Sequence, residues 1–209
     1  MDKHELRTLA TAKRARVKPE ARAAAPVMVM QKLLKELAML DAKRQGGSTL
    51  LVGLYVDCGT ELSTLTLEAG VLSQGFRVSY PVCFADGRME YALEADGAVR
   101  GLIQKKPSHV FDTTADAEVL AGLDFVEPTD LDALVVPLLG FDLRCYRLGM
   151  GGGYYDRYLP RLAPGTPTIG VAFDEQWVEG VPNEAHDCPL SAVIIPSRDI
   201  IRRQNPTGA

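Results

Sequence analysis

The sequence has few cysteines, and none of them are paired at metal-binding or redox spacing. Its four cysteines, Cys58, Cys83, Cys145 and Cys188, are far apart, so the 209 residues contain no C-x-x-C motif. A zinc site or a redox-active dithiol is therefore not expected. Reduced, widely spaced thiols are typical of cytosolic proteins.

Long apolar runs are missing as well. No stretch approaches the roughly 20 apolar residues that a helix needs to cross a bilayer. The first residues, Met1 to Glu5, lack the apolar core of a signal peptide. We therefore expect a cytoplasmic protein without a membrane partner.

Positive charge is not in excess. Lysine and arginine number 23 against 27 acidic residues, which gives a net charge of −4. This balance gives no indication of nucleic acid binding, although a small anion responds to local potential rather than to net charge. A hydrophobic content of 46% is ordinary. The length suits one domain with a substantial core, so we expect a single domain over residues 1–209.

Three familiar site motifs are absent. No G-x-S-x-G elbow accompanies the histidines, so a Ser-His-Asp hydrolase is unsupported. The most glycine-rich stretch, R-L-G-M-G-G-G-Y-Y-D at 147–156, has Tyr154 where the dinucleotide fingerprint G-x-G-x-x-G needs its last glycine. It also lacks the Lys-Ser/Thr pair of a Walker A loop.

The glycine-rich stretch instead has the composition of an anion-binding loop. Four glycines fall between Gly149 and Gly153, after an apolar run at 133–139 and before a helix-compatible segment that starts at Tyr154. Glycines let main-chain amides crowd an anion, and a helix N-terminus adds about half a positive charge. Arg147 would add a full charge, and Asp156 could hold the Mg²⁺ of a polyphosphate. The glycines alone also fit a tight strand-to-helix turn that binds nothing.

The N-terminal segment predicts two helices, one over residues 2–16 with a basic face and one from Pro19 to about Lys43, ended by Gly46-Gly47. Most of these basic residues fit a solvated surface. Lys3 and Arg7 lie four positions apart, hence on one helix face, and could grip a polyphosphate together.

An acidic residue follows the first expected strand. Residues 50–56 read as a buried strand, and a helix is expected from about Glu61 to Ser73 with Thr60 as its N-cap. Glu61 would then lie at the carboxyl end of a strand, where open α/β sheets bind ligands. It could equally serve only to interact with the helix dipole.

The remaining strands alternate with helical segments. Residues 96–127 suggest only loops around one short helix. The pattern predicts a three-layer α/β fold with a mostly parallel, open, Rossmann-like sheet and helices on both faces. Further strands are expected at 76–82, 88–93, 133–139, 168–173 and 192–195.

The motifs together resemble one enzyme family. R-L-G-x-G-x-G-Y-Y-D after V-P-x-L-x-F-D, here Arg147 to Asp156 after Val136 to Asp142, is similar to the signature of the 5-formyltetrahydrofolate cyclo-ligases. Glu61 to Thr64, Ala172 to Gln176 and Pro182 to Asp187 resemble further family segments. The resemblance implies ATP-dependent cyclisation of 5-formyltetrahydrofolate to 5,10-methenyltetrahydrofolate, with release of ADP and phosphate. The formyl oxygen would be phosphorylated first, and an amine of the folate would then attack.

The same resemblance implies a role for each matching residue. Arg147, Tyr154 and Tyr155 would flank the reacting groups, although at least one tyrosine ring could simply pack against the loop. Mg²⁺ would be held by Asp156 and Asp187. The folate would contact Val56, Glu61, Met89 and Tyr155, although a strand methionine such as Met89 is often a core residue. ATP would contact Lys3, Arg7, Arg147, Leu148, Gly149, Met150, Gly151, Gly152, Gly153, Tyr154 and Tyr155.

The sequence departs from the family pattern at two places. Met150 stands where family members often carry a long polar or aromatic side chain, and Pro196-Ser197 replaces the usual Thr-Glu ending. Backbone donors dominate such a cradle, so nucleotide binding should survive. We expect a monomer. Two other functions stay open: a module that senses folate or nucleotide without turnover, and an ATP-independent sugar-phosphate or acyl-transfer enzyme on a related scaffold.

Overall fold

The computed structural model describes residues 1–44, 48–106, 109–184 and 187–203. Gly46 and Gly47, expected to end the second helix, lie outside the described residues. Within the described ranges, no helix combines the length and apolarity needed to cross a bilayer.

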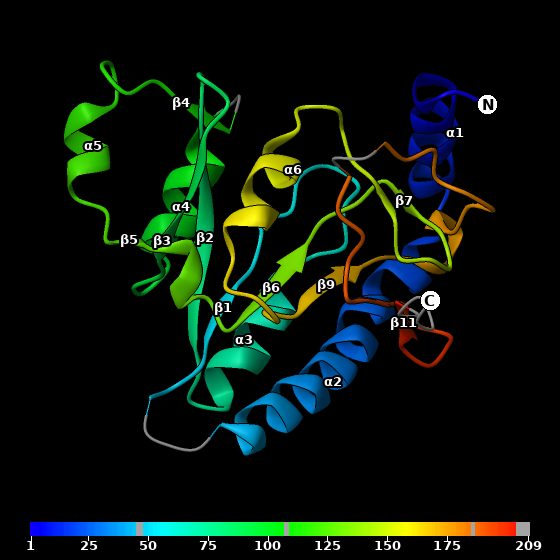
Figure 1. Ribbon diagram of the computed structural model, residues 1–209, viewed down its shortest axis with the longest axis horizontal. Helices are drawn as coiled ribbons and strands as arrows, with labels where there is room; N and C mark the ends of the chain where they lie inside the picture. The colour runs from blue at the N-terminus through cyan, green and yellow to red at the C-terminus, as the bar shows by residue number, and fades with distance from the viewer. Residues whose placement is uncertain (45–47, 107–108, 185–186, 204–209) are drawn as a thin grey trace.

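Two helices open the chain, as the periodicity predicts. Helix α1 (Lys3–Ala15) begins in a capping box, because Asp2 accepts hydrogen bonds from the amides of His4 and Glu5. Helix α2 (Pro19–Lys43) starts with proline, which has no amide to leave unsatisfied there. Figure 1 shows α2 running along the sheet next to α3 (Leu65–Ser73).

The central sheet is mostly parallel, which confirms the expected fold class. The described strands follow the order β11-β10-β9-β6-β1-β2-β3-β5, with β4 also paired to β2. The pairs from β10 across to β2 are parallel, and β3, β5 and β11 run antiparallel to their neighbours. The bounds are β1 Leu51–Gly53, β2 Arg77–Phe84, β3 Met89–Leu93, β4 Val110–Phe111, β5 Phe125–Val126, β6 Ala133–Val136, β9 Thr168–Val171, β10 Ala192–Ile194 and β11 Ile201–Arg202.

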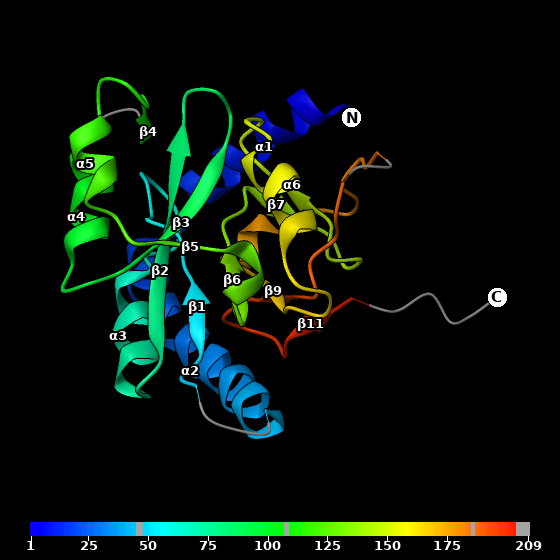
Figure 2. The same ribbon diagram turned by 60° about the vertical axis from the view of Figure 1, so that its left-hand side comes forward.

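Helices cover both faces of the sheet. Along β6, Ala133 and Val135 enter one core with side chains of α2, α3 and α4 (Ala98–Lys105), while Leu134 and Val136 enter a second core. The second core contains Tyr158 of α6 (Tyr154–Tyr158). This alternation is the period of a strand buried on both sides. Figure 2, turned from the first view, shows α4 and α5 (Ala117–Ala121) outside the β2–β3 hairpin.

Several expected elements were wrong in extent; the strand expected at 133–139, for example, is regular only over β6. The strand at 50–56 is regular only over β1, and helix α3 starts at Leu65, with Thr64 rather than Thr60 at its N-cap. The Asp57 carboxylate explains the later start, because it accepts hydrogen bonds from the amide and hydroxyl of Thr64 and closes the intervening segment as a loop. Residues 96–127 hold α4, α5 and two short strands, rather than one helix.

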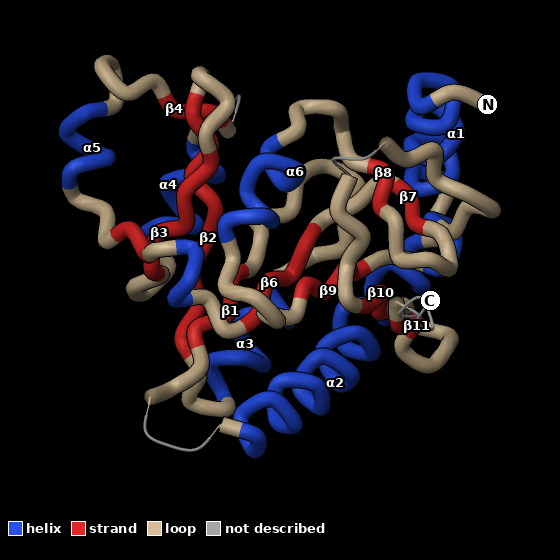
Figure 3. Tube along the Cα trace, in the orientation of Figure 1, coloured by secondary structure: helices blue, strands red, loops and turns tan. Residues whose placement is uncertain are grey.

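A hairpin absent from the expectations follows β6. Strands β7 (Gly140–Phe141) and β8 (Arg147–Leu148) pair with each other and lie apart from the main sheet, beside α1 (Figure 3). Leu6 and Ala10 of α1 share a small core with Leu139 and Leu148. The hairpin thereby joins the N-terminal helix to the glycine-rich stretch. Three 3-10 turns, η1 Pro128–Asp130, η2 Leu159–Arg161 and η3 Asp174–Gln176, complete the described elements.

Candidate active site

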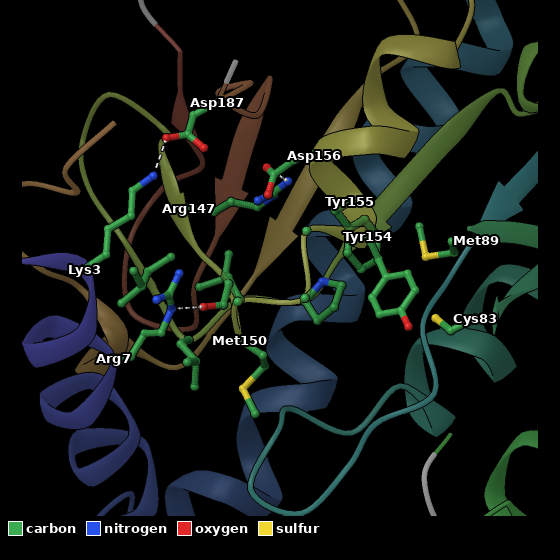
Figure 4. Close-up of a pocket in the computed structure, with 18 of the residues that line it drawn as sticks. Lys3, Arg7, Cys83, Met89, Arg147, Met150, Tyr154, Tyr155, Asp156 and Asp187 are labelled. Carbon is green, nitrogen blue, oxygen red and sulfur yellow. Dashed lines mark hydrogen bonds and ion pairs between the residues drawn. The ribbon is translucent and has the colours of Figure 1, made fainter. Parts of the chain in front are cut away.

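A cavity of about 420 Å³ lies where the glycine-rich stretch meets α1 and the β2–β3 hairpin (Figure 4). Its lining includes every predicted site residue except Val56. Val56 is buried in the main core on the α2 face and does not reach the described wall. Five apolar wall residues and one acidic one were not predicted: Pro81, Cys83, Pro137, Leu138, Leu139 and Glu184.

The glycine loop, residues 149–153, has a backbone that side chains would not tolerate. Gly151 and Gly153 have φ angles of +103° and +67°. A Cβ on Gly152 would come within 3.0 Å of the Tyr154 ring. No amide of residues 149–153 donates a hydrogen bond to any described residue. The loop therefore presents spare main-chain donors at the cavity wall.

Arg147 and Asp156 form an ion pair at this wall. Arg147 projects from β8, is only 6% exposed, and its Nη2 lies 2.6 Å from Asp156 Oδ1. Its Nε is buried with no hydrogen-bond partner among the described residues. The side chain also lines the cavity, so the guanidinium is placed to meet an anion there.

Lys3 and Arg7 reach the same cavity from one face of α1 (Figure 4). Lys3 Nζ lies 2.7 Å from Asp187 Oδ2 and 3.2 Å from Glu184 Oε1, and the hydrogen bond to Asp187 is the main reason that the pKa of Lys3 is raised. Arg7 Nε donates to the carbonyl of Gly149 over 3.0 Å. Arg7 thus holds the glycine loop as well as facing the cavity.

Glu61 lies in an irregular segment rather than in a first helical turn, so the helix-dipole interpretation was wrong. The amide of Cys58 donates to Glu61 Oε2 over 2.9 Å, and Arg14 Nη1 lies 3.6 Å from Oε1. Burial raises the pKa of Glu61, and these two partners oppose that rise. The buried Arg14 was missed, although Lys3, Arg7 and Arg14 fall on one helical stripe, which was the available signal.

The opposite wall is apolar and comes from β2 and β3. Met89 is 2% exposed, so it is a core residue that also lines the cavity. Cys83 lies beside it (Figure 4), and burial raises the pKa of its thiol to about 11. The thiol is therefore protonated at neutral pH and acts as an apolar wall group.

The two tyrosines of the motif have engaged hydroxyls. Tyr154 donates to the carbonyl of Phe84 over 3.1 Å, and the Tyr155 hydroxyl lies 3.4 Å from that of Tyr91. Burial raises the pKa of Tyr155, so its phenol stays neutral. Both rings line the cavity and both hydroxyls help to fix the wall.

The wall carries two carboxylates that suit Mg²⁺ only with a further ligand. Among the described residues, no group of three or more His, Cys, Asp or Glu side chains could hold a metal ion. Asp156 and Asp187 each contact a cation instead. Mg²⁺ usually binds one or two carboxylates plus substrate phosphates and water, so this pair fits an ion that arrives with a polyphosphate.

Comparisons with known proteins agree on one family. A model described as the 5-formyltetrahydrofolate cyclo-ligase family matches residues 1–196. The Escherichia coli K12 5-formyltetrahydrofolate cyclo-ligase is 46% identical over 76 residues, which is 36% of this chain and 42% of that protein. The Mycolicibacterium smegmatis 5-formyltetrahydrofolate cyclo-ligase is 29% identical over 156 residues, 70% of this chain and 74% of that one.

Two solved structures share the fold. A 5,10-methenyltetrahydrofolate synthetase from Mycoplasma pneumoniae superposes with a TM-score of 0.68 at 23% identity. The superposition covers 98% of this chain and 100% of the other. The NMR structure of the Aquifex aeolicus synthetase gives a TM-score of 0.71 at 23% identity, over 100% of this chain and 96% of the other. At this identity the likeness concerns the fold alone.

Proposed function

Because the chain belongs to the 5-formyltetrahydrofolate cyclo-ligase family, we propose that it converts 5-formyltetrahydrofolate and MgATP into 5,10-methenyltetrahydrofolate, ADP and phosphate. One observation carries the assignment of the site: unused main-chain donors, the buried guanidinium of Arg147 and a half-buried carboxylate, Glu61, line the same cavity.

In this proposal the triphosphate of ATP lies along the glycine loop. Its negative charge would be met by the amides of residues 149–153 and by Arg147, Lys3 and Arg7, all on one wall. Such preorganised donors are most effective where water is excluded, because they need no reorganisation during reaction. Asp156 and Asp187, which pair with Arg147 and Lys3, would hold Mg²⁺ together with the phosphates. When bound, Mg²⁺ would neutralise charge on the phosphates.

The folate would lie across the cavity from the glycine loop. Glu61 would accept hydrogen bonds from the pterin, while Met89 and Tyr155 would contact its flat face. The Cys58 amide and Arg14 fix the carboxylate of Glu61 before the substrate arrives. A preorganised acceptor reduces the entropy cost of binding. Val56 is proposed to act only from behind the wall, by packing.

The chemical step then needs positioning more than a nucleophile from the protein. The terminal phosphoryl group of ATP moves to the formyl oxygen, and ADP leaves. The neighbouring folate amine attacks the activated formyl carbon and closes the ring, and inorganic phosphate departs with the former formyl oxygen. Arg147 would stabilise the charge on the transferring group, which is the main demand of phosphoryl transfer. Tyr154 and Tyr155 would confine the reacting groups.

A steady-state assay tests this proposal directly. Methenyltetrahydrofolate formation, followed by its absorbance, should require both 5-formyltetrahydrofolate and MgATP, and ADP should form in equal amount. Binding of folate without turnover would indicate a sensing module, and product formation without ATP would indicate another transferase; either result would reject the proposal. We also propose that residues 1–209 form one cytoplasmic domain that acts as a monomer, without nucleic acid or membrane partners. Light scattering of the pure protein tests the monomeric state.

A further inference from the structure

Arg157 connects the glycine loop to the β2–β3 turn from outside the main cavity. Its Nε and Nη2 donate to the carbonyl of Gly87 over 3.0 and 2.8 Å, and Nη2 also donates to the carbonyl of Gly152 over 2.8 Å. The guanidinium lies 5.4 Å from the centroid of the Tyr154 ring. One side chain therefore bridges two main-chain segments that lie far apart in the sequence.

Arg157 lies behind the loop rather than in front of it. It lines a smaller cavity of about 170 Å³ and is not among the described residues that line the main one. The two cavities share Met89 and Tyr154 as a partition. The carbonyl of Gly152 is thus drawn toward the back of the loop.

The orientation of one carbonyl fixes the orientation of the next amide. A trans peptide is planar, so the N–H of Gly153 points away from the C=O of Gly152. With that carbonyl held by Arg157, the Gly153 amide is directed away from the guanidinium. No described residue accepts a hydrogen bond from this amide, and Gly153 lines the main cavity.

Without such a contact, this peptide could turn over easily. It lies between two glycines, which adopt left- and right-handed backbone angles with similar ease. A rotated peptide would present a carbonyl to the cavity, where an anion would be repelled. The contact from Arg157 selects one of these two orientations, and a ligand's apparent affinity scales with the population of the competent one.

We propose that Arg157 is a positioning residue for the nucleotide: it holds the Gly152–Gly153 peptide with its amide toward the phosphates. This inference rests on the proposed function of the site and adds a residue that never touches the substrate. It predicts a specific loss of MgATP affinity when the guanidinium is removed.

The test compares Arg157→Met with Arg88→Met. Arg88→Met removes the same charge from the same small cavity. The Arg88 guanidinium, however, pairs with Asp86 within the turn and does not touch the glycine loop. Arg157→Met should weaken MgATP binding about tenfold in calorimetry, which is the usual net worth of one such hydrogen bond. Arg88→Met should stay within about twofold of the wild type.

A conservative variant and steady-state kinetics distinguish a positioning role of Arg157 from a merely structural one. Arg157→Lys keeps one donor and should recover most of the affinity, to within about threefold. In Arg157→Met the KM for ATP should rise while kcat and the KM for folate stay near wild type. The Gly153 amide signal in a ¹⁵N NMR spectrum should shift on addition of MgATP in the wild type and broaden or double in Arg157→Met before addition.

Each outcome decides the inference. Equal MgATP affinity in Arg157→Met and the wild type, or an equal rise of the KM for both substrates, overturns it. If Arg157→Met fails to fold, Arg157→Lys decides the inference. A wild-type NMR spectrum with intermediate MgATP affinity in Arg157→Lys supports the inference, and complete loss of affinity for both substrates counts against it. A wild-type protein that gives no heat with MgATP would reject the proposed function itself, which is a different result.

Discussion

The two walls of the cavity differ in what they leave unsatisfied. The glycine-loop wall has donors in excess, since its amides and the Nε of Arg147 lack acceptors among the described residues. The Glu61 wall, by which we mean Glu61 with the apolar residues Pro81, Cys83 and Met89, has an acceptor that an amide and a guanidinium hold in place. The first wall therefore fits a ligand that brings negative charge. The second fits one that brings neutral donors and a flat apolar body.

The difference also shows how each wall is built. Main chain supplies the donors of the glycine loop, so substitutions act there through backbone shape and through the surrounding arginines. The recognition group of the Glu61 wall is a side chain, so a substitution of Glu61 itself can alter the acceptor. Four substitutions test this contrast.

The largest effect is expected for Arg147→Ala, which removes the buried cation from the glycine-loop wall. Loss of a charge that faces a transferring phosphoryl group should lower kcat about a thousandfold or more. The circular dichroism spectrum should remain that of the folded protein. Arg202→Ala is the matched control, because Arg202 Nη2 pairs with Glu36 Oε1 over 2.8 Å at the sheet edge, away from the cavity lining. Near-wild-type turnover in Arg147→Ala would contradict the role given to this wall.

Glu61→Gln should affect the other wall. It should raise the KM for the folate about 10- to 100-fold, because a hydrogen bond to a charged group is worth about 1.5–3 kcal/mol. MgATP binding measured without folate should be unchanged. A variant that weakens MgATP and folate binding equally would show that the two walls are not separate.

The same variant should change the pH dependence of stability. Burial raises the pKa of Glu61 above its ordinary 4.5, so the folded protein keeps this proton at pH values where the unfolded chain has lost it. Stability from this group is therefore greatest below pH 4.5 and declines as the pH rises through the raised pKa. Urea unfolding of Glu61→Gln across this range should lack that component of the decline. An unchanged pH profile would show that Glu61 is not buried as described.

A smaller effect is expected from Gly153→Ala compared with Gly59→Ala. Both glycines have left-handed φ angles, +67° and +58°, so each alanine should cost about 1–2 kcal/mol of stability. A Cβ at Gly153 would also lie 2.6 Å from Arg157 Nη1, whereas one at Gly59 meets nothing within 4 Å. Only Gly153→Ala should weaken MgATP binding, by about tenfold. Calorimetry alongside thermal unfolding checks both; equal MgATP affinity in the two variants would argue against loop shape as the determinant.

The smallest effect is expected from Met150→Ala. The Met150 side chain is 72% exposed, and the proposed contribution of this position is its amide. MgATP affinity should change by less than about twofold, because a main-chain donor survives the substitution. A large loss would show that this side chain, rather than the loop backbone, contacts the nucleotide.

The glycine loop could be predicted because its signal is contiguous. Residues 147–156 give a motif, a strand before it and a helix after it, all within local sequence. Lys3 and Arg7 could be paired because helical spacing alone places them on one face. The parallel sheet could be predicted because its strands are apolar and alternate with helices.

Other parts of the site depend on contacts that local sequence does not carry. Strands β7 and β8 have two residues each, too few for a period of two to be visible. The late start of α3 depends on Asp57, which is itself held by Arg100 over 2.7 Å from a helix far along the chain. The pairing of Arg14 with Glu61 joins two segments through tertiary packing. Cys83 carries no motif and reaches the cavity only through the register of β2 with β3.

The contact between Lys3 and Asp187 spans 184 positions. On a ribosome, Asp187 is made long after Lys3, so this contact forms late in the synthesis of residues 1–187. The cavity therefore cannot take its final form before residue 187 has been made. A chain halted before position 187 would lack Asp187, β10 and β11, so Lys3 would lose this partner and the cavity wall would be incomplete.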